Sequence, residues 1–392
     1  MTQFTEQAID QIFKYVGNRK ILDPTVSLCH HCHSHIPAYR MEEDGMIYLV
    51  KYCNEHGVQK YIIETSAEFY YGLMKSMEDP RFNMSGGLLI ETTDRCNLDC
   101  PHCYHLPDND SADVNRQILI DTIKTFPIDK PGDGIHRIIL AGAEPTLRPD
   151  FPQLCAEVSE IHETLHPAVM TNGIRFNNTR WLKESKAAGL VSVNVGLNHP
   201  SYHNHKIIRN KQETAINNIF EQDLDMGYIS YTMIEMNELP DILQEIINSP
   251  WHPQTFRVRL GSEIGRNATQ NVYRLSNLYY AAKEWCEKNN KSFIDINPAD
   301  NNIYHMMVDI EGKIVRLIQW CDETNIDMEE LRTGPWNYFV PHDGITNFLH
   351  QIIRRDTATN KGLELPDKVP ARYNYKPNIE YDKSKPDLLK LY

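Results

Sequence analysis

Alternating strand-like and helix-like hydrophobic patterns fill the middle of the chain. Short apolar or alternating runs predict strands, and each precedes a stretch with the periodicity of a helix. The expected strands are "GLLIETT", "RIILAG", "AVMTNG", "VSVNVGLN", "ISYTMIEM" and "FRVRLGSEIG". The expected helices cover about 114–125, 150–161, 179–188, 213–224, 241–248 and 272–288. Strands alternating with helices predict βαβ units and a parallel sheet.

Six such units predict an α/β fold, a partial (βα)6 TIM-like barrel. In barrels of this kind the chemistry gathers at the carboxyl ends of the strands. We therefore expect the loops that follow the six strands to lie around one mouth of the barrel. These loops begin near Asp94, Gly142, Thr171, Asn194, Met236 and Gly261.

Segments of different character flank this core. Residues 1–85 hold two helix-like stretches around a cysteine-containing region and predict a small metal-binding unit. Residues 86–291 form the expected core. Residues 292–392 predict an α+β extension: a hairpin turning at Glu311–Gly312, a helix near 345–355 and an irregular tail.

The amino-acid composition of the chain argues against some classes of function. The chain has 392 residues, 41% of them hydrophobic, and a formal net charge of −13. An acidic excess argues against broad binding of nucleic acid or anionic membranes, whose protein partners carry excess Lys and Arg. No apolar run approaches the roughly 18 to 20 residues of a membrane span. "MTQFTEQAIDQIFKYV" lacks the features of a signal peptide, so we expect a cytoplasmic protein with no transmembrane segment.

Three cysteines fall within "RCNLDCPHCY", directly after the first expected strand of the core. In a reducing compartment clustered cysteines are typical of metal or redox sites. Cys96, Cys100 and Cys103 would leave one iron of a four-iron cluster without a protein ligand, free to bind a small molecule. The alternatives are a zinc site completed by His102 or His105, or three unrelated buried thiols.

A second set of ligand-type residues lies near the N-terminus. Cys29 and Cys32, followed by Cys53 and His56, are spaced like the two knuckles of a ribbon that holds one metal ion tetrahedrally. Three thiolates and one imidazole favour zinc, with iron in a rubredoxin-like site or a second iron–sulfur centre as alternatives. Other histidines could supply the fourth ligand, namely His30, His31, His33 and His35. Cys155, Cys286 and Cys321 have no ligand spacing and are expected to be ordinary thiols.

Taken together, these motifs resemble those of the radical S-adenosylmethionine (radical SAM) superfamily. "CNLDCPHC" resembles its cluster signature, and "GAEPTLRPDF" is similar to its glycine-rich stretch after the second strand, with Ala143 in place of one glycine. "MTNG" and "VNVGLNHPSYHN" fall at the expected third and fourth strand ends. The N-terminal cysteine element resembles that of a subgroup with tetraether lipid synthases and pterin-methylating enzymes.

The resemblance implies a [4Fe-4S] cluster, S-adenosylmethionine (SAM) as second cofactor and an electron donor such as flavodoxin or ferredoxin. Reductive cleavage of SAM would give a 5′-deoxyadenosyl radical that takes hydrogen from an organic substrate. Cys96, Cys100 and Cys103 would be the iron ligands. Expected contacts to SAM are His102, Gly142, Ala143, Glu144, Asn194, Asn198 and Arg259. Expected contacts to the substrate are Tyr304, His305 and Arg316.

Several functions remain open at this point. The leading hypothesis is a radical SAM enzyme acting on an unidentified organic substrate. Peptide modification and lipid modification or methyl transfer are alternatives within the same class. A non-catalytic iron–sulfur or zinc protein that binds or senses is the alternative outside it.

Overall fold

The computed structural model describes residues 6–29, 35–77, 87–100, 102–103, 107, 109–124, 136–197, 205–260, 273–296 and 305–319. Its N-terminal elements are α1 (Glu6–Val16), β1 (Lys20–Leu28), β2 (His35–Glu43), β3 (Met46–Cys53), β4 (Gly57–Glu64) and α2 (Ala67–Met77). The next are β5 (Gly87–Thr93), α3 (Arg116–Lys124), β6 (His136–Gly142), α4 (Phe151–Ile161), β7 (Leu165–Thr171), α5 (Thr179–Ala187) and β8 (Ser192–Gly196). The last are α6 (His205–Glu221), β9 (Asp225–Met233), α7 (Leu239–Asn248), β10 (Thr255–Leu260), α8 (Leu275–Lys288), β11 (Phe293–Asp295), β12 (His305–Ile310) and β13 (Lys313–Ile318). Short 3-10 turns cover Pro145–Leu147, Ile174–Asn177 and Met236–Glu238.

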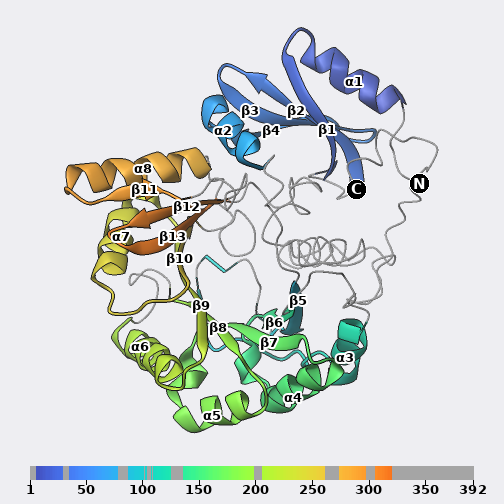
Figure 1. The fold of residues 1–392 in the computed structure, drawn as a ribbon. Coiled ribbons are helices and arrows are strands. Elements are labelled where there is room, and N and C mark those ends of the chain that lie inside the picture. Colours follow the sequence, from blue (N-terminus) through green and yellow to red (C-terminus); the bar gives the residue numbers. More distant parts are fainter. Residues whose placement is uncertain are drawn as a thin grey trace.

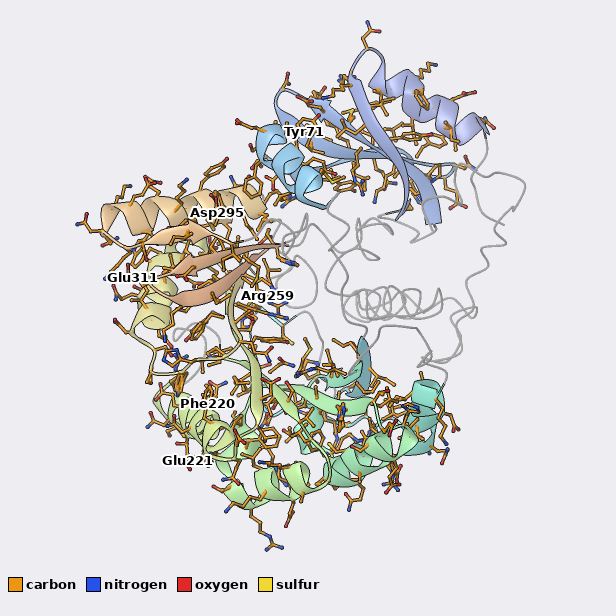
Figure 2. All side chains as sticks on the ribbon, in the orientation of Figure 1. Tyr71, Phe220, Glu221, Arg259, Asp295 and Glu311 are labelled. Carbon is orange, nitrogen blue, oxygen red and sulfur yellow. The ribbon has the colours of Figure 1, made fainter. Side chains whose placement is uncertain are left out.

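A curved sheet forms the core and confirms the predicted fold class. Its order within the described residues is β11-β12-β13-β10-β9-β8-β7-β6-β5, and β5 to β10 run parallel. Figure 1 shows α4 to α8 on the outer, convex side of this sheet. In Figure 2, Arg259 of β10 lies on the concave side, whereas Phe220 and Glu221 of α6 lie on the outer side.

Alternation along the strands separates an apolar face from a polar one. On β10, Phe256, Val258 and Leu260 are buried in the main hydrophobic cluster, and the residues between them point the other way. The cluster continues through Val193 and Ile229 of the neighbouring strands. The helices therefore pack against an apolar outer face, and the concave face is left to polar side chains.

The predicted hairpin is confirmed and extends the same sheet. Glu311 and Gly312 have φ of 53° and 78°, the left-handed pair typical of a type I′ turn. β13 then pairs in parallel with β10, with Phe256 opposite Val315. The expected helix at 345–355 and the tail at 357–392 lie outside the described residues.

One helix begins earlier than the hydrophobic pattern indicates. A helix was expected over 213–224, and α6 covers His205–Glu221. Its early turns carry few buried residues, and the side chain of Ile207 is 70% exposed. Without an inward apolar stripe, those turns leave no periodic signal in the sequence.

The N-terminal unit is an antiparallel sheet in the order β1-β2-β3-β4. Ile12 and Val16 of α1 pack on Met41, Tyr48 and Val50 of this sheet. The sequence predicted a metal-binding ribbon here without resolving these strands.

A buried carboxylate joins this unit to the core. The side chain of Glu64 at the end of β4 is 2% exposed and accepts hydrogen bonds from the Ser276 amide (3.1 Å) and hydroxyl, in the first turn of α8. Arg274 donates through Nε to the Ile62 carbonyl at 2.7 Å. Ile318 of β13 completes an apolar cluster with residues of the N-terminal sheet. The position of the N-terminal unit thus depends on the start of α8.

The Glu64 junction makes stability depend on pH. Burial raises the pKa of Glu64, although hydrogen bonds from Ser276 act against the shift. A raised pKa means that this carboxyl contributes most below the ordinary Glu value of about 4.3, and that the contribution is lost as pH rises through the shifted value. Glu64→Gln removes this titration. We expect the variant to lose less unfolding free energy than the wild type as pH rises from about 4 to about 7.

Chemical denaturation across this pH range measures the effect. Glu68→Gln, at an exposed position on α2, is the matched control and should follow the wild-type profile. Parallel profiles for wild type and Glu64→Gln would show that the junction does not titrate as described.

Candidate functional site

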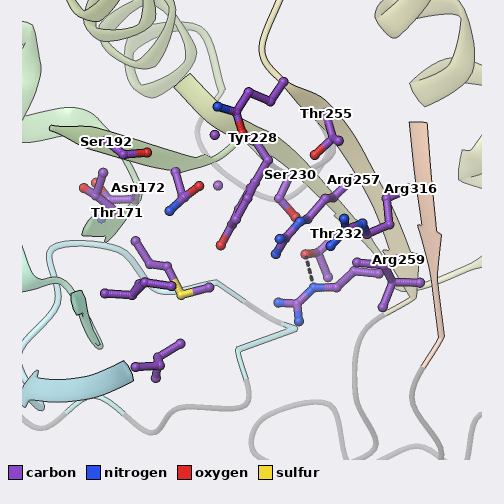
Figure 3. Close-up of a pocket in the computed structure, with 18 of the residues that line it drawn as sticks. Thr171, Asn172, Ser192, Tyr228, Ser230, Thr232, Thr255, Arg257, Arg259 and Arg316 are labelled. Carbon is purple, nitrogen blue, oxygen red and sulfur yellow. Dashed lines mark hydrogen bonds between the residues drawn. The ribbon is translucent and has the colours of Figure 1, made fainter. Parts of the chain in front are cut away.

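A cavity of about 480 Å³ lies on the concave side of the core sheet. Its lining comes from strands β5 to β10 and β13, from loop residues after β5, β6 and β7, and from Gln254 just before β10. Figure 3 shows part of this lining, with Tyr228, Ser230 and Arg257 from adjacent strands. The polar lining residues are His102, Arg137, Thr171, Asn172, Ser192, Asn194, Tyr228, Ser230, Thr232, Gln254, Thr255, Arg257, Arg259 and Arg316. The volume suits one small ligand or part of a larger one.

The cysteine loop begins where β5 ends, and backbone hydrogen bonds hold it to the end of β6. Ala143 N donates to Thr93 O, and Glu144 N donates to Arg95 O, both at 3.0 Å. Gly142 has a φ of 116°, and a side chain on it would come within 2.5 Å of the Thr93 carbonyl oxygen. Glycine is therefore required at this close approach.

Charged side chains stabilise the same loop from the other side. Arg95 forms an ion pair with Asp113 (Nη2–Oδ2 2.6 Å), and Thr93 Oγ1 donates to the same carboxylate at 2.6 Å. Burial alone would raise the pKa of Asp113, but the hydrogen bonds from Arg95 and Thr93 more than offset it and lower the pKa. Arg148 is 2% exposed and donates to Thr92 O at 2.7 Å. The base of the loop is thus fixed by several independent contacts.

The thiols of this loop fit an iron–sulfur cluster. Cys96, Cys100 and Cys103 are all partly exposed. The Leu98 amide donates to Cys96 Sγ at 3.4 Å, and Asn172 Nδ2 lies 3.9 Å from it. N–H groups directed at sulfur are typical of cluster thiolates, whose potential they tune. Burial raises the pKa of Cys96 to about 11, so a thiolate here needs the positive charge of bound metal.

Glu144 was expected to offer backbone groups to SAM, and its side chain connects strand ends. It is fully buried and accepts hydrogen bonds from Thr146 and from Thr171 Oγ1 (2.6 Å), while its other oxygen accepts from Asn172 N (2.7 Å). Burial raises the pKa of Glu144, and the hydrogen bonds from Thr146 and Thr171 oppose the shift. Gly142 and Ala143 line the cavity, whereas Glu144 is not among its described lining residues. The side chain of Glu144 therefore lies behind the cavity wall.

Other expected SAM contacts do meet in the cavity lining. His102 and Asn194 are 6% and 7% exposed, and both line it together with Arg259. Gly227 leaves room for Asn194, because a side chain there would come within 2.5 Å of Asn194 Oδ1. Asn198 lies outside the described residues. The fold thus brings His102, Asn194 and Arg259 together around one cavity.

Of the three expected substrate contacts, one lines the cavity. Arg316 of β13 lines the cavity. His305 begins β12 and is 2% exposed, and it is not among the lining residues. Tyr304 lies outside the described residues.

Sequence reasoning assigned no role to Asn172, which connects two loops of the site. Its Nδ2 donates to Asn97 Oδ1 at 2.7 Å, and its backbone N–H binds Glu144. Gln212 of α6 donates to the Asn172 carbonyl at 2.8 Å. The available signal was its place at the end of the third expected strand, "AVMTNG". Ser230 and Thr232 were also missed, although polar residues alternate with apolar ones along β9.

A second donor group lies in the N-terminal sheet. Cys29 follows β1, Cys53 ends β3 and His56 lies in the turn before β4, with their ligand atoms within 4.8 Å of one another. His56 Nδ1 is 3.5 Å from Cys29 Sγ and 3.4 Å from Cys53 Sγ. Tetrahedral zinc, with bonds of about 2.3 Å to sulfur and about 2.0 Å to nitrogen, sets those donors about 3.5 Å apart. The three described donors therefore fit zinc.

The fourth donor of this group is not described. Cys32 and the spare candidates His30, His31 and His33 lie outside the described residues, as does the side chain of His35. Gln59 donates through Nε2 to Cys29 Sγ at 3.1 Å. A hydrogen bond from a buried amide stabilises negative charge on the sulfur, as is usual for outer contacts of metal ligands.

The remaining described cysteines are buried thiols. Cys155 of α4 and Cys286 of α8 are both 0% exposed in the hydrophobic core. Burial raises the pKa of both, that of Cys286 to about 11. Cys321 lies outside the described residues. No helix among the described residues has both the length and the apolar content to cross a membrane.

Comparisons with known proteins match both metal-binding parts. The family model of the radical SAM superfamily matches residues 90–238, and that of the HMPTM N-terminal zinc ribbon domain matches residues 21–65. A 7,8-dihydro-6-hydroxymethylpterin dimethyltransferase of Methanocaldococcus jannaschii is 30% identical over 234 residues, covering 54% of this chain and 46% of that protein. A GTP 3′,8-cyclase of Clostridium perfringens is 31% identical over 110 residues, covering 28% of this chain and 33% of that protein. The chain thus matches less than half the length of either relative.

Solved structures include similar chains. Streptococcus suis SuiB bound to S-adenosylmethionine aligns with a TM-score of 0.42 and 13% identity, over 65% of this chain and 54% of that chain. The two family matches imply a [4Fe-4S] cluster and SAM for the core and zinc for the ribbon. The predicted resemblance is therefore confirmed: the chain contains a radical SAM core, matched over residues 90–238, and an N-terminal zinc ribbon of the HMPTM type, matched over residues 21–65.

Proposed function

We propose that the protein cleaves SAM reductively at a [4Fe-4S] cluster held by Cys96, Cys100 and Cys103, and uses the radical to functionalise a small heterocyclic substrate of the pterin class. The observation that carries this proposal is the position of the cysteine loop. It follows β5 and is hydrogen-bonded to the β6 end, whose Gly142 and Ala143 line the cavity. When bound, the cluster supplies the electron that splits the sulfonium of SAM.

The side chains of the cavity then take specific roles in binding SAM. The amides of Ala143 and Glu144 already donate to backbone carbonyls, so the methionyl ammonium would meet carbonyl oxygens of this turn. The ring of His102 would contact adenine, and the amide of Asn194 the ribose hydroxyls. Arg259 would meet the methionyl carboxylate, with its Nε oriented by Thr232 Oγ1 at 3.1 Å.

Glu144 contributes to the proposed site as a positioning residue. Its carboxylate joins the turn after β6 to the end of β7, and the Asn172 side chain extends the connection to Asn97 of the cysteine loop. A fixed turn and a fixed loop hold the SAM contacts at a constant distance from the cluster. Such preorganisation reduces the reorganisation needed when substrate binds.

The character of the cavity favours a small polar substrate over a lipid. Hydroxyls, amides and arginines dominate its described lining, and a hydrocarbon chain would leave these groups without partners. The sequence relative in Methanocaldococcus jannaschii bears the name of a pterin dimethyltransferase, which supports a pterin-like ring and methyl transfer as the outcome. Peptide modification has no comparable support in the described residues.

In this proposal the chain works as three domains, residues 1–85, 86–291 and 292–392. The N-terminal zinc ribbon has a structural role beside the core, to which Glu64 and Ser276 join it. The β12–β13 hairpin of the third domain continues the core sheet. A flavodoxin or ferredoxin would supply the electron. The clustered thiols at the proposed cluster site suit a reducing cytoplasm.

The cysteine loop can be tested directly. We expect Cys100→Ala to abolish formation of 5′-deoxyadenosine and methionine from SAM, because an iron loses its ligand. The same variant should lose conversion of 7,8-dihydro-6-hydroxymethylpterin, because no radical forms to take hydrogen from it. The cleavage products and the pterin are measured by mass spectrometry after anaerobic reconstitution and reduction.

Cys286→Ala is the matched control for this experiment. It removes a buried thiol of α8 that lies outside the loop, and cleavage should continue. Wild-type rates of SAM cleavage in Cys100→Ala would contradict the proposal. Cleavage without conversion of this pterin would retain the cluster assignment and reject the free hydroxymethylpterin as the substrate.

The zinc ribbon gives an independent prediction. Cys53→Ser should reduce bound zinc from about one equivalent per chain to near zero and lower the unfolding temperature, because metal binding stabilises a small ribbon. Elemental analysis and calorimetry measure the two effects. Cys155→Ser, at a buried position in α4, should retain its zinc. A ribbon that keeps full zinc without Cys53 would rule out the assigned donor set.

A further inference from the structure

Two arginines lie at one level of the cavity wall. Arg257 of β10 and Arg316 of β13 are register partners on adjacent parallel strands, and both line the cavity. Figure 3 shows their side chains and that of Arg259 along the same wall. Guanidinium groups from neighbouring strands can bind one oxyanion from two sides, and each offers it a planar pair of N–H donors.

Packing orients the first member of this pair. The guanidinium carbon of Arg257 lies 3.5 Å from the ring centroid of Tyr228, whose side chain is 8% exposed. Stacking of this kind fixes the plane of the guanidinium while its edge still points to a ligand. Arg316 is positioned through Nε, which lies 3.1 Å from Met307 Sδ. The two charges are therefore held by packing at the cavity wall.

Neighbouring groups add hydrogen-bond donors of the same kind. Ser230 of β9 is the register partner of Arg257, and Thr255 precedes it by two positions on the same face. Arg137 also lines the cavity and forms an ion pair with Asp225 at 2.8 Å. None of the described lining residues is Asp or Glu, although the chain has a net charge of −13. Such a lining offers donors and positive potential to an anionic ligand.

The pair is distinct from the proposed contact to the methionyl carboxylate of SAM, Arg259. Arg257 comes two residues before Arg259, so it lies about 6.6 Å farther from the carboxyl end of the strand. The cysteine loop follows the carboxyl end of β5, so the methionyl carboxylate of SAM belongs at the mouth. An anion at Arg257 and Arg316 would then be part of the substrate.

We propose that Arg257 and Arg316 bind a phosphoryl group of the substrate, so that the protein acts on a phosphate or diphosphate ester of its heterocycle. The inference rests on the proposed function and narrows its substrate class. It also implies a preceding reaction in which the hydroxyl of the heterocyclic alcohol attacks a nucleoside triphosphate. The new ester bond then forms as the nucleoside diphosphate or monophosphate leaves.

Binding of inorganic pyrophosphate tests the pair directly, because this probe carries only the phosphoryl groups that the two arginines would hold. We expect the reconstituted full-length protein to bind it in anaerobic calorimetry at low salt. Arg257→Gln and Arg316→Gln should each weaken binding by about tenfold or more, because a charged donor pair is lost. Arg257→Lys retains the charge without the planar fork and should weaken binding as well. Arg180→Gln, on the exposed surface of α5, is the control and should bind as the wild type does.

Each outcome decides one question. Equal pyrophosphate affinity in wild type and both glutamine variants would overturn the pair, and so would succinate binding as tightly as pyrophosphate. Iron content and circular dichroism show whether the variants are folded, and if the glutamine variants are not, Arg257→Lys alone decides. SAM cleavage by the wild type is measured separately. Its absence would reject the proposed function, whereas cleavage with unselective anion binding would reject only the phosphoryl site.

Discussion

The buried carboxylate of Glu144 joins strand ends beside the cysteine loop. This side chain joins the turn after β6 to Thr171 and Asn172 at the end of β7, while the backbone of the same turn bonds to Thr93 and Arg95. Three strand ends thus meet at one buried group. A buried carboxylate is costly unless hydrogen bonds satisfy it, and here several donors do so. The same cost keeps the strand ends together, because separating them would leave the carboxylate unsatisfied.

The two faces of the core sheet divide structure from function. Alternate residues of each strand pack against the outer helices and form the main hydrophobic cluster. The other residues line the cavity and are free of packing demands, so they can be polar or charged. Charged side chains on the concave face therefore indicate what kind of ligand the cavity binds, whereas those on the helices mostly face solvent.

Local patterns in the sequence predicted most of the core. Period-two strands, helical periodicity and the spacing of Cys96, Cys100 and Cys103 are all signals within a few residues of one another. The hairpin turn at Glu311–Gly312 was likewise predictable from its residues. α6 was predicted too short because its first turns are exposed, and the four strands of the N-terminal sheet were not resolved individually.

Contacts between distant segments were not predictable from those patterns. Arg257 and Arg316 are 59 residues apart, and only the pairing of β10 with β13 brings them to one level. Glu144 is the reverse case. Its sequence motif marked it as a site residue, but its side chain faces the protein interior. A motif indicates where a site is, whereas the role of each side chain depends on its partners in space. Register and burial are properties of the folded chain as a whole.

Electron paramagnetic resonance of the reduced cluster tests the central claim most directly. The claim is that three cysteines leave one iron open for SAM. With SAM labelled with ¹⁷O at its carboxylate and ¹⁵N at its amine, electron–nuclear double resonance should detect coupling of both nuclei to the cluster. The signal of the reduced cluster should also change when SAM is added. An unchanged signal with no coupling to either label would contradict the account.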